Sequence, residues 1–254
     1  MKIKFLGTGT SHGVPLIGCN CETCTSDNPK NKRYRTSIFV SKNDTDIIID
    51  TPAEFRLRAI EYKIKRVDAV LFTHAHMDHI AGLDDIRRFN EMQNCKINAF
   101  ADKKNLKEIK KRFSYVFEKT QEGGGKPKIK FIEIKPYKMF RVKNFKIIPL
   151  PVMHGKLQVM GFRIDDFVYM TDVSKIPEKT YKYLKNVKVL ILDALRKKEH
   201  PTHFNLKQAI NEAQKIGARH TFFTHIAHSL EHNKTEKLLP QGIKLAYDGL
   251  ELKL

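Results

Sequence analysis

Long apolar runs are absent from the sequence. In its 254 residues no stretch of about 18 consecutive apolar residues occurs, which is the length that a helix needs to cross a bilayer. The first residues, Met1 to Gly7, have the pattern of a strand that enters a glycine turn and not that of a signal peptide. The sequence therefore predicts a protein with no membrane partner, and we expect it in the cytoplasm.

Cysteine is scarce as well. Four cysteines in a chain of this length do not form the dense framework of a disulfide-stapled domain. Three of them, Cys19, Cys21 and Cys24, fall within six residues, a spacing that suits metal binding better than crosslinking. The fourth, Cys95, is predicted to be an ordinary buried thiol.

The sequence also lacks internal repeats and long low-complexity tracts. Because 254 residues with 41% hydrophobic content are enough for one large α/β core and too few for two, we predict a single domain over residues 1–254. Three glycines and a proline punctuate the segment from Thr120 to Pro127. This segment is expected to be a loop within the domain, near the mouth of the site.

Acidic residues are few: 28 Asp and Glu stand against 47 Lys and Arg, which gives a formal net charge of +19. Such a surface attracts polyanions, because it raises their local concentration and speeds their encounter. The lysines are spread along the chain and are not concentrated in a tail, so a lysine-rich composition explains the charge equally well. A nucleic-acid partner stays an open alternative.

Short β-branched runs alternate with amphipathic segments. Strands are predicted at residues 2–6, 37–41, 46–50, 68–72, 97–101, 129–134, 145–150, 158–164, 167–171, 188–192, 221–224 and 244–247. Helices are predicted at residues 53–64, 83–92, 104–117, 178–184 and 206–216. This alternation predicts an α/β fold and fits a four-layer αββα sandwich of two sheets, although a doubly wound single sheet has the same periodicity.

A cluster of metal-binding side chains directly follows the apolar strand at residues 69–72. Residues 74–79 read H-A-H-M-D-H. In extended backbone alternate side chains share a face, so His74 and His76 can reach one metal ion while Asp78 and His79 point to a second. Imidazole and carboxylate ligands together suit borderline divalent ions such as zinc, manganese or iron.

This H-x-H-x-D-H pattern after an apolar strand resembles the signature of the metallo-β-lactamase superfamily of hydrolases, which implies the αββα sandwich. Further residues match in the superfamily's order. The resemblance implies that Asp50 holds the metal site in place, that His154 is the third ligand of the first metal and that His225 is the last ligand of the second. Asp172 resembles the carboxylate that bridges both metals. Asp50 also suits the alternative role of a helix N-cap.

The resemblance therefore implies a dinuclear centre with His74, His76 and His154 on one metal, Asp78, His79 and His225 on the other, and Asp172 on both. Two cations about 3.5–4 Å apart share a water, lower its pKa and clamp the attacking and leaving oxygens at phosphorus. The expected nucleophile is a hydroxide that bridges two zinc or manganese ions. Asp78 is counted among the catalytic residues as well as among the ligands.

A second metal site is predicted upstream, after a glycine-rich turn at residues 7–15. The turn lacks the ending of a phosphate-binding P-loop, so we expect it to border the active site. Cys19, Cys21 and Cys24 need a fourth ligand to close a tetrahedral structural zinc site, and His228 is the natural candidate. A catalytic or redox role of the thiols is the alternative.

The cysteine motif and the hydrolase motif together resemble the PhnP-type phosphodiesterases over nearly the whole chain, from Gly7 to Leu250. That family serves the phosphonate-degrading carbon-phosphorus lyase pathway and hydrolyses cyclic ribosyl phosphates. His203 matches the family's active-site histidine, which implies that it donates a proton to the leaving oxygen. The alternative for His203 is a neighbour of the N-terminus of the helix at residues 206–216, and His200 is not expected to participate.

The resemblance implies a metal-dependent phosphodiesterase, a phosphoric diester hydrolase, that acts on a small cyclic phosphodiester or nucleotide. Arginines expected near the site face favour a phosphate substrate over a neutral ester: Arg33, Arg35, Arg87 and Arg88. The fold alone names no substrate. Whether the chain forms a homodimer is left open.

Three other functions are compatible with parts of the pattern. A tRNA 3′-processing endonuclease shares the histidine motif and suits the charge, but no long arm rich in glycine and proline is visible. An oxygen-reducing di-iron protein of this fold usually has glutamate at the position of His76. A non-catalytic nucleic-acid-binding protein would use the cysteines as a zinc module.

Overall fold

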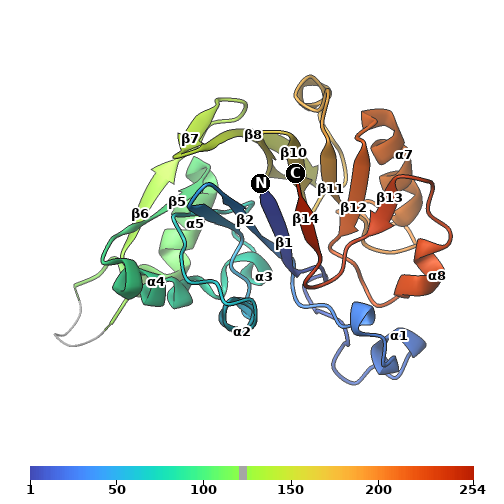
Figure 1. The fold of residues 1–254 in the computed structure, drawn as a ribbon, viewed down its shortest axis with the longest axis horizontal. Coiled ribbons are helices and arrows are strands. Elements are labelled where there is room, and N and C mark those ends of the chain that lie inside the picture. Colours follow the sequence, from blue (N-terminus) through green and yellow to red (C-terminus); the bar gives the residue numbers. More distant parts are fainter. Residues whose placement is uncertain (120–124) are drawn as a thin grey trace.

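Strands from both halves of the chain form two sheets that pack face to face, with helices on both outer sides (Figure 1). The computed structural model describes residues 1–119 and 125–254. The four-layer αββα sandwich expected from the sequence is confirmed. The loop expected from Thr120 to Pro127 lies partly outside the described residues, since residues 120–124 are not among them.

The first sheet is built from the N-terminal half of the chain and carries the last strand at one edge. Its spatial order is β14-β1-β2-β3-β4-β5-β6. Strands β3 to β6 run parallel, whereas β1 pairs antiparallel with both β2 and β14. The strands are β1 (Lys2–Gly7), β2 (Ser37–Lys42), β3 (Thr45–Ile49), β4 (Ala69–Leu71), β5 (Ile97–Ala101), β6 (Ile129–Glu133) and β14 (Glu251–Lys253).

The second sheet has the order β13-β12-β11-β10-β9-β8-β7. Strands β10 to β13 run parallel, and β7, β8 and β9 form an antiparallel meander beside them. As β9 is antiparallel to both of its neighbours, β8 ends on the same side as β10. The strands are β7 (Phe140–Val142), β8 (Phe145–His154), β9 (Leu157–Ile164), β10 (Phe167–Met170), β11 (Val189–Asp193), β12 (His220–Thr224) and β13 (Ile243–Leu245).

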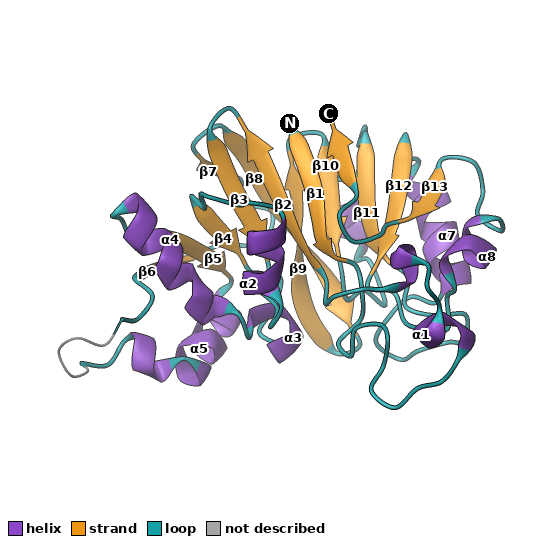
Figure 2. Ribbon diagram, turned by 60° about the horizontal axis from the view of Figure 1, so that its bottom comes forward, coloured by secondary structure: helices purple, strands orange, loops and turns teal. Residues whose placement is uncertain are grey.

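Helices cover the outer face of each sheet (Figure 2). The described helices are α1 (Glu22–Thr25), α2 (Phe55–Glu61), α3 (Met77–Ile80), α4 (Ile86–Gln93), α5 (Lys103–Arg112), α6 (Glu178–Tyr181), α7 (Leu206–Ile216) and α8 (His232–Glu236). The prediction for α7 is confirmed at both ends, because Asn205 and Gln208 form a capping box and Gly217 ends the helix in left-handed backbone. Among the described helices, none combines the length and apolar character that crossing a bilayer requires.

Apolar side chains fill three layers between the elements. The central layer joins the inner faces of the two sheets and includes Phe5, Phe162 and Tyr169. One outer layer packs α2, α4 and α5 against the first sheet, and the other packs α7 against the second. Three apolar layers are what a four-layer sandwich requires, since each interface must exclude water.

Strand β8 is longer than the expected strand at residues 145–150, because it continues to His154 through two prolines. Pro149 and Pro151 pair with Phe162 and Met160 of β9. On the other side of β8, strand β7 covers only residues 145–147, so the prolines lie where this side of β8 is an edge. Proline is tolerated at an edge because no ladder hydrogen bond needs its missing N–H. This extension carries His154 to the carboxyl end of the strand.

The prediction that Cys95 is a buried thiol is wrong. Cys95 is exposed and not buried. It follows Asn94, whose left-handed backbone ends α4 and turns the chain outward before β5 begins. The free thiol therefore belongs to the surface and not to the core.

Candidate metal centre

The candidate ligands are brought together because the strands that precede them end at one edge of the sandwich. β3 and β4 run parallel in the first sheet, and β10 and β12 run in one direction in the second. The H-x-H-x-D-H segment follows β4, with His76 at the N-cap of the short helix α3. Carboxyl ends of parallel strands in open α/β sheets are the usual place for a ligand crevice.

Three of the residues that follow these strands share an unusual backbone conformation. Asp50 after β3, Asp172 after β10 and His225 after β12 have φ angles of 63°, 57° and 59°. Left-handed backbone is uncommon for residues other than glycine and concentrates at functional sites. These turns lie at the carboxyl ends of their strands, and the side chains of Asp172 and His225 approach each other to 3.4 Å there.

The first predicted ligand group forms a cluster of imidazole rings. The ring of His74 lies 4.4 Å from that of His76 and 5.8 Å from that of His154, measured between centroids. His74 Nε2 is 2.9 Å from His76 Nδ1. The Nδ1 atom of His154 lies 2.8 Å from the carbonyl oxygen of Thr202, which fixes the ring and directs Nε2 away from that carbonyl.

The second predicted group is joined to the first through Asp172. His79 Nε2 is 3.4 Å from Asp78 Oδ2 and 3.2 Å from Asp172 Oδ2. His225 Nε2 is 3.4 Å from Asp172 Oδ1, so the two oxygens of Asp172 face different imidazoles. The ligand atoms of His74, His79 and Asp172 lie within 4.8 Å of one another, as do those of Asp78, His79 and His225.

Asp50 connects the metal-binding segment to β3. Its carboxylate accepts hydrogen bonds of 2.8 Å from the backbone N–H and from the hydroxyl of Thr73, and it lies 2.7 Å from His79 Nδ1. With Nδ1 held by a carboxylate, the Nε2 atom of His79 is left to face the cluster. The alternative role of a helix N-cap is wrong, since α2 begins at Phe55 with Glu54 at its N-cap.

Unpaired buried nitrogens indicate that the cluster suits a cation. Within the described residues, His79 Nε2 and both ring nitrogens of His225 are buried without a hydrogen-bond partner. A buried polar atom without a partner is costly, so such atoms call for an explanation. Imidazole nitrogens beside carboxylates form a donor set that divalent metals accept, and this chemistry fits the residues present.

The electrostatics of the cluster also favour added positive charge. Burial opposes protonation of His225, but the carboxylates of Asp172 and Asp78 raise its pKa to about 9. Burial likewise acts against His79, yet Asp172, Asp78 and Asp50 raise its pKa well above the ordinary value. The carboxylates that stabilise these protons would equally stabilise divalent cations, whose binding displaces protons from the ligands.

Asp193 is a functional candidate that the sequence analysis missed. Its Oδ2 lies 2.8 Å from His203 Nδ1 and accepts a 2.8 Å hydrogen bond from the backbone N–H of Val173. Its Oδ1 is 3.9 Å from His225 Nδ1. As the last residue of β11, Asp193 had the same signal as Asp172, a carboxylate at the end of an apolar strand. Asp193 thus approaches the Nδ1 atoms of two histidines of the cluster, His203 and His225.

His203 faces the cluster. Its Nε2 lies 4.0 Å from Asp172 Oδ1, and its ring centroid is 4.6 Å from that of His154. Because Asp193 accepts the proton on Nδ1, Nε2 is the atom that can exchange a proton with a bound molecule. His200 lies beside it, with a ring centroid 5.1 Å away, but not among the candidate ligands.

The cysteine loop and the C-terminal half form a second, separate cluster. The Sγ atoms of Cys19, Cys21 and Cys24 lie 3.4, 3.3 and 3.7 Å from His228 Nδ1. The backbone N–H of Cys24 lowers the pKa of Cys21 to about 6, which favours the thiolate that binds metal. The structure thus brings together the four residues predicted for a closed zinc site.

Three of the four arginines expected at the site face lie elsewhere, whereas Arg35 donates a 2.7 Å hydrogen bond to the carbonyl of Ser11, near His203. Arg33 is buried and donates hydrogen bonds to the Thr8 hydroxyl and the Ala246 carbonyl, so its expected role is wrong. Arg35 forms an ion pair with Glu54. Arg87 and Arg88 belong to α4 and line a groove that contains none of the candidate ligands.

A cavity of about 620 Å³ opens beside His203. Its wall combines the loop after β11, which carries His203, with the glycine-rich turn at Thr10 to His12 and with His228 of the cysteine cluster. The basic side chains in this wall are those of Arg196, Lys197 and Lys198. No carboxylate is found among the described residues that line the cavity. A concave site of this size is typical of small-molecule binding.

Comparisons with known proteins agree with this architecture. The family model of the β-lactamase superfamily domain matches residues 45–226. An octanoyltransferase of Porphyromonas gingivalis is 37% identical over 254 residues, which are 99% of this chain and 51% of that protein. The chain thus spans about half the length of this relative. A ribonuclease Z of Clostridium acetobutylicum is 35% identical over 72 residues, 28% of this chain and 22% of that protein.

Solved structures extend the likeness to the whole chain. The crystal structure of a new diphosphatase from the PhnP family is 38% identical, with a TM-score of 0.93, and the match covers 100% of this chain and 97% of that one. Zinc-bound PqqB from Methylobacterium extorquens has a TM-score of 0.82 at 17% identity, with 100% of both chains covered. The second match shows the shared fold alone.

Proposed function

Because the chain belongs to the metallo-β-lactamase superfamily, and within it to the PhnP family, we propose that this hydrolase cleaves small phosphodiesters. The substrate class that we propose is a cyclic phosphodiester or a nucleotide. The observation that carries the proposal is the position of Asp172, whose two carboxylate oxygens face His79 and His225 while His203 lies 4.0 Å away.

We propose that one metal is held by His74, His76 and His154, the second by Asp78, His79 and His225, and that Asp172 serves both. Bound as a pair, divalent metals supply an activated water and stabilise negative charge on the oxygens of a phosphoryl group. Zinc and manganese both suit this donor set. The protein's own part is to fix the ligands, and Asp50 does this for His79 through its 2.7 Å contact with Nδ1.

His203 is proposed as the general acid. Its Nε2 faces the cluster, and Asp193 holds its Nδ1, which orients the ring. A proton at Nε2 can pass to the leaving oxygen as the phosphorus–oxygen bond breaks. Asp193 acts in this proposal through His203, as a positioning residue.

The cavity beside His203 supports a small anionic substrate. Its volume of about 620 Å³ suits a nucleotide-sized molecule. Arg196 is held by hydrogen bonds to the carbonyls of Lys198 and Glu199, which shapes the basic loop at its rim. Since this wall has cations and no carboxylate in the described part of the chain, it attracts phosphate over a neutral ester.

Replacement of His203 by alanine is expected to lower kcat by an amount that depends on the leaving group of the substrate. With a phosphodiester whose alcohol leaves poorly, kcat should fall about 10²–10⁴-fold, because the departing oxygen needs a proton. With bis-para-nitrophenyl phosphate, whose leaving group departs as a stable anion, the loss should be much smaller. Steady-state rates on both substrates measure this difference, and Asp193→Asn should show the same pattern more weakly.

His200→Ala is the matched control, since this ring lies next to His203 but not among the candidate ligands. It should leave the ratio of the two rates close to that of the original protein. An equal loss on both substrates in His203→Ala would contradict the acid role and leave a ligand or binding role for this residue.

A second candidate function is tRNA 3′-processing, which the similarity to ribonuclease Z and the net charge of +19 favour. Purified protein loaded with zinc or manganese separates the two functions. We expect faster hydrolysis of cyclic nucleotides and ribosyl cyclic phosphates than of a precursor tRNA. Cleavage of the precursor tRNA at the higher kcat/KM would overturn the proposal.

A further inference from the structure

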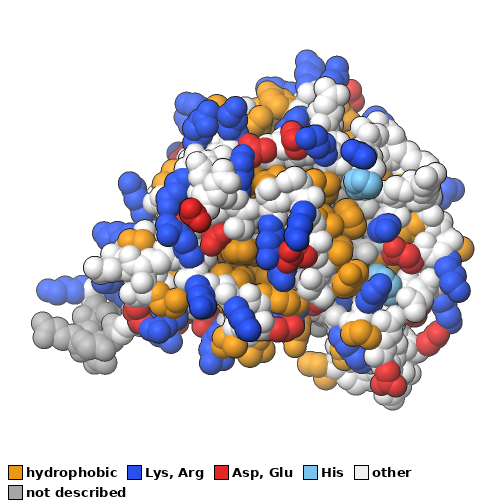
Figure 3. Space-filling model, viewed as in Figure 1, with side chains coloured by type: hydrophobic (Ala, Val, Ile, Leu, Met, Phe, Trp, Pro, Cys, Tyr) orange, Lys and Arg blue, Asp and Glu red, His pale blue; other side chains and the backbone are white. Residues whose placement is uncertain are grey.

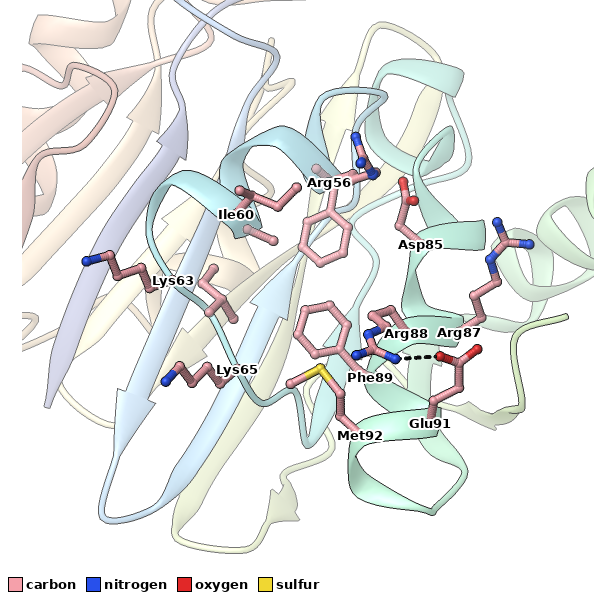
Figure 4. A pocket seen from close by; sticks show the side chains of 13 residues that line it. Arg56, Ile60, Lys63, Lys65, Asp85, Arg87, Arg88, Phe89, Glu91 and Met92 are labelled. Carbon is pink, nitrogen blue, oxygen red and sulfur yellow. Dashed lines mark hydrogen bonds and ion pairs between the residues drawn. The ribbon is translucent and has the colours of Figure 1, made fainter. Parts of the chain in front are cut away.

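A groove between α2 and α4 lies apart from both metal clusters. Its volume is about 610 Å³, and none of the candidate metal ligands lines it. Figure 4 shows Ile60 on the α2 side and Met92 on the α4 side, with Phe89 between them. The two helices belong to the outer layer over the first sheet, so the groove opens away from the central core.

The floor of the groove is apolar and preformed. The rings of Phe55 and Phe89 pack at a centroid distance of 6.0 Å and are only 1% and 5% exposed. Above them, Ile60 and Met92 are 61% and 47% exposed, which is unusual for large apolar side chains. An apolar surface framed by polar residues is typical of an interaction site.

The rim of the groove is basic. Five cations line it, namely Arg56, Lys63, Lys65, Arg87 and Arg88, against the two carboxylates Asp85 and Glu91. Arg88 is bound to Glu91 at 2.9 Å and Arg87 to Asp84 at 3.3 Å, so the lining cations without an ion pair among the described residues are Arg56, Lys63 and Lys65. The turn that follows α2 is fixed, since Ile64 N–H donates to the Ala59 carbonyl and Lys63 adopts left-handed backbone. Figure 3 shows apolar surface between Lys and Arg side chains on this face of the molecule.

We propose that this groove binds an acidic amphipathic helix of a partner protein. An apolar stripe of the partner would cover Ile60 and Met92, and its carboxylates would meet the basic rim. A helix fits because α2 and α4 already present the ridges and groove against which a third helix packs. Charge complementarity selects an acidic partner and speeds its association.

Other occupants fit the groove less well. A second copy of this chain would bring a chain of net charge +19 against the same basic rim, which is repulsive. Single-stranded RNA binds through stacking of bases on exposed aromatic rings, but both phenylalanines are buried and the exposed apolar side chains above them, Ile60 and Met92, are not aromatic. A bilayer surface is too flat to reach the floor of a groove.

The test uses the whole protein and a synthetic helical peptide of about 18 residues, with leucines at three- and four-residue steps and glutamates elsewhere. A scrambled peptide of the same composition keeps the charge without the apolar stripe. Fluorescence anisotropy should show tighter binding of the amphipathic peptide. Amide hydrogen exchange should show protection within residues 55–65 and 85–93.

Substitutions at exposed residues can locate the peptide-binding site without unfolding the protein. Ile60→Glu should weaken binding at least about ten-fold, because it places a carboxylate on the exposed apolar surface of the groove. Lys65→Glu should weaken it less and reduce its dependence on salt. Leu238→Glu is the matched control, since Leu238 is 67% exposed and does not line the groove, and it should bind as the original protein does.

Three results would overturn the proposal. One is equal binding of the scrambled peptide, and another is an equal loss in Ile60→Glu and Leu238→Glu. The third is tighter, Ile60-dependent binding of oligouridylate or of phosphatidylglycerol vesicles than of the peptide. Hydrolysis of bis-para-nitrophenyl phosphate should be unchanged in all these variants, because the groove contains none of the candidate metal ligands.

Discussion

Asp172→Asn is expected to abolish turnover and to reduce the metal content of the active site. The substitution keeps the shape of a side chain that is 2% exposed and removes the charge shared by His79 and His225. Loss of residues that only position ligands typically costs about 10–100-fold in metal affinity or activity, so loss of a shared ligand should cost more. Hydrolysis of bis-para-nitrophenyl phosphate and metal analysis of the purified protein measure both effects.

Asp166→Asn is the matched control for this experiment. Asp166 lies in the turn before β10, and its ion pair with Lys188 is at the surface. Its replacement should change neither the rate nor the metal content, because exposed ion pairs contribute little. An Asp172→Asn protein that kept two metals and normal turnover would refute the dinuclear assignment.

Cys21→Ser is expected to act on stability and zinc content. Cys21 and His228 come from opposite ends of the chain, so a metal between them ties the N-terminal loop to the segment after β12. A metal present at about 1,000 times its Kd contributes about 4 kcal/mol to the folded state. For a chain of this size that corresponds to a fall of about 8–16 °C in Tm. Thermal unfolding and zinc analysis of the same sample test this.

Cys95→Ser is the matched control, since Cys95 is exposed and far in sequence from the cluster. It should keep both the zinc and the Tm of the original protein. Turnover per folded molecule of Cys21→Ser should stay well above that of Asp172→Asn, because the thiol cluster does not include the proposed reaction centre. A Cys21→Ser protein with unchanged zinc and stability would show that the cluster is not a metal site.

The two substitutions distinguish the two clusters by different measurements. Asp172 lies among buried imidazoles at the ends of strands, and in our proposal its charge serves the reaction. Cys21 lies in a loop that the short helix α1 alone cannot stabilise, and in our proposal a bound metal serves its folding. Rate loss with retained stability therefore points to the first cluster, and loss of stability with retained rate points to the second.

Local patterns in the sequence predicted much of the fold. Short β-branched runs located most strands within one or two residues, and the amphipathic pattern at residues 206–216 located both ends of α7. The edge strands β7 and β14 were missed. Each has only three residues, and its pairing depends on a neighbouring strand and not on its own apolar pattern.

The sequence by itself determined which side chains are available to bind metal, because the spacing of residues 74–79 and of the three cysteines is a local property. Only the tertiary structure decided which distant residues join them. Asp193 lies close to His203 and His225 because the parallel strands that carry them end at one edge. Arg33 points into the interior, because its buried guanidinium needs hydrogen-bond acceptors such as the Thr8 hydroxyl. Such distances between segments follow from how the two sheets pack, which no local pattern encodes.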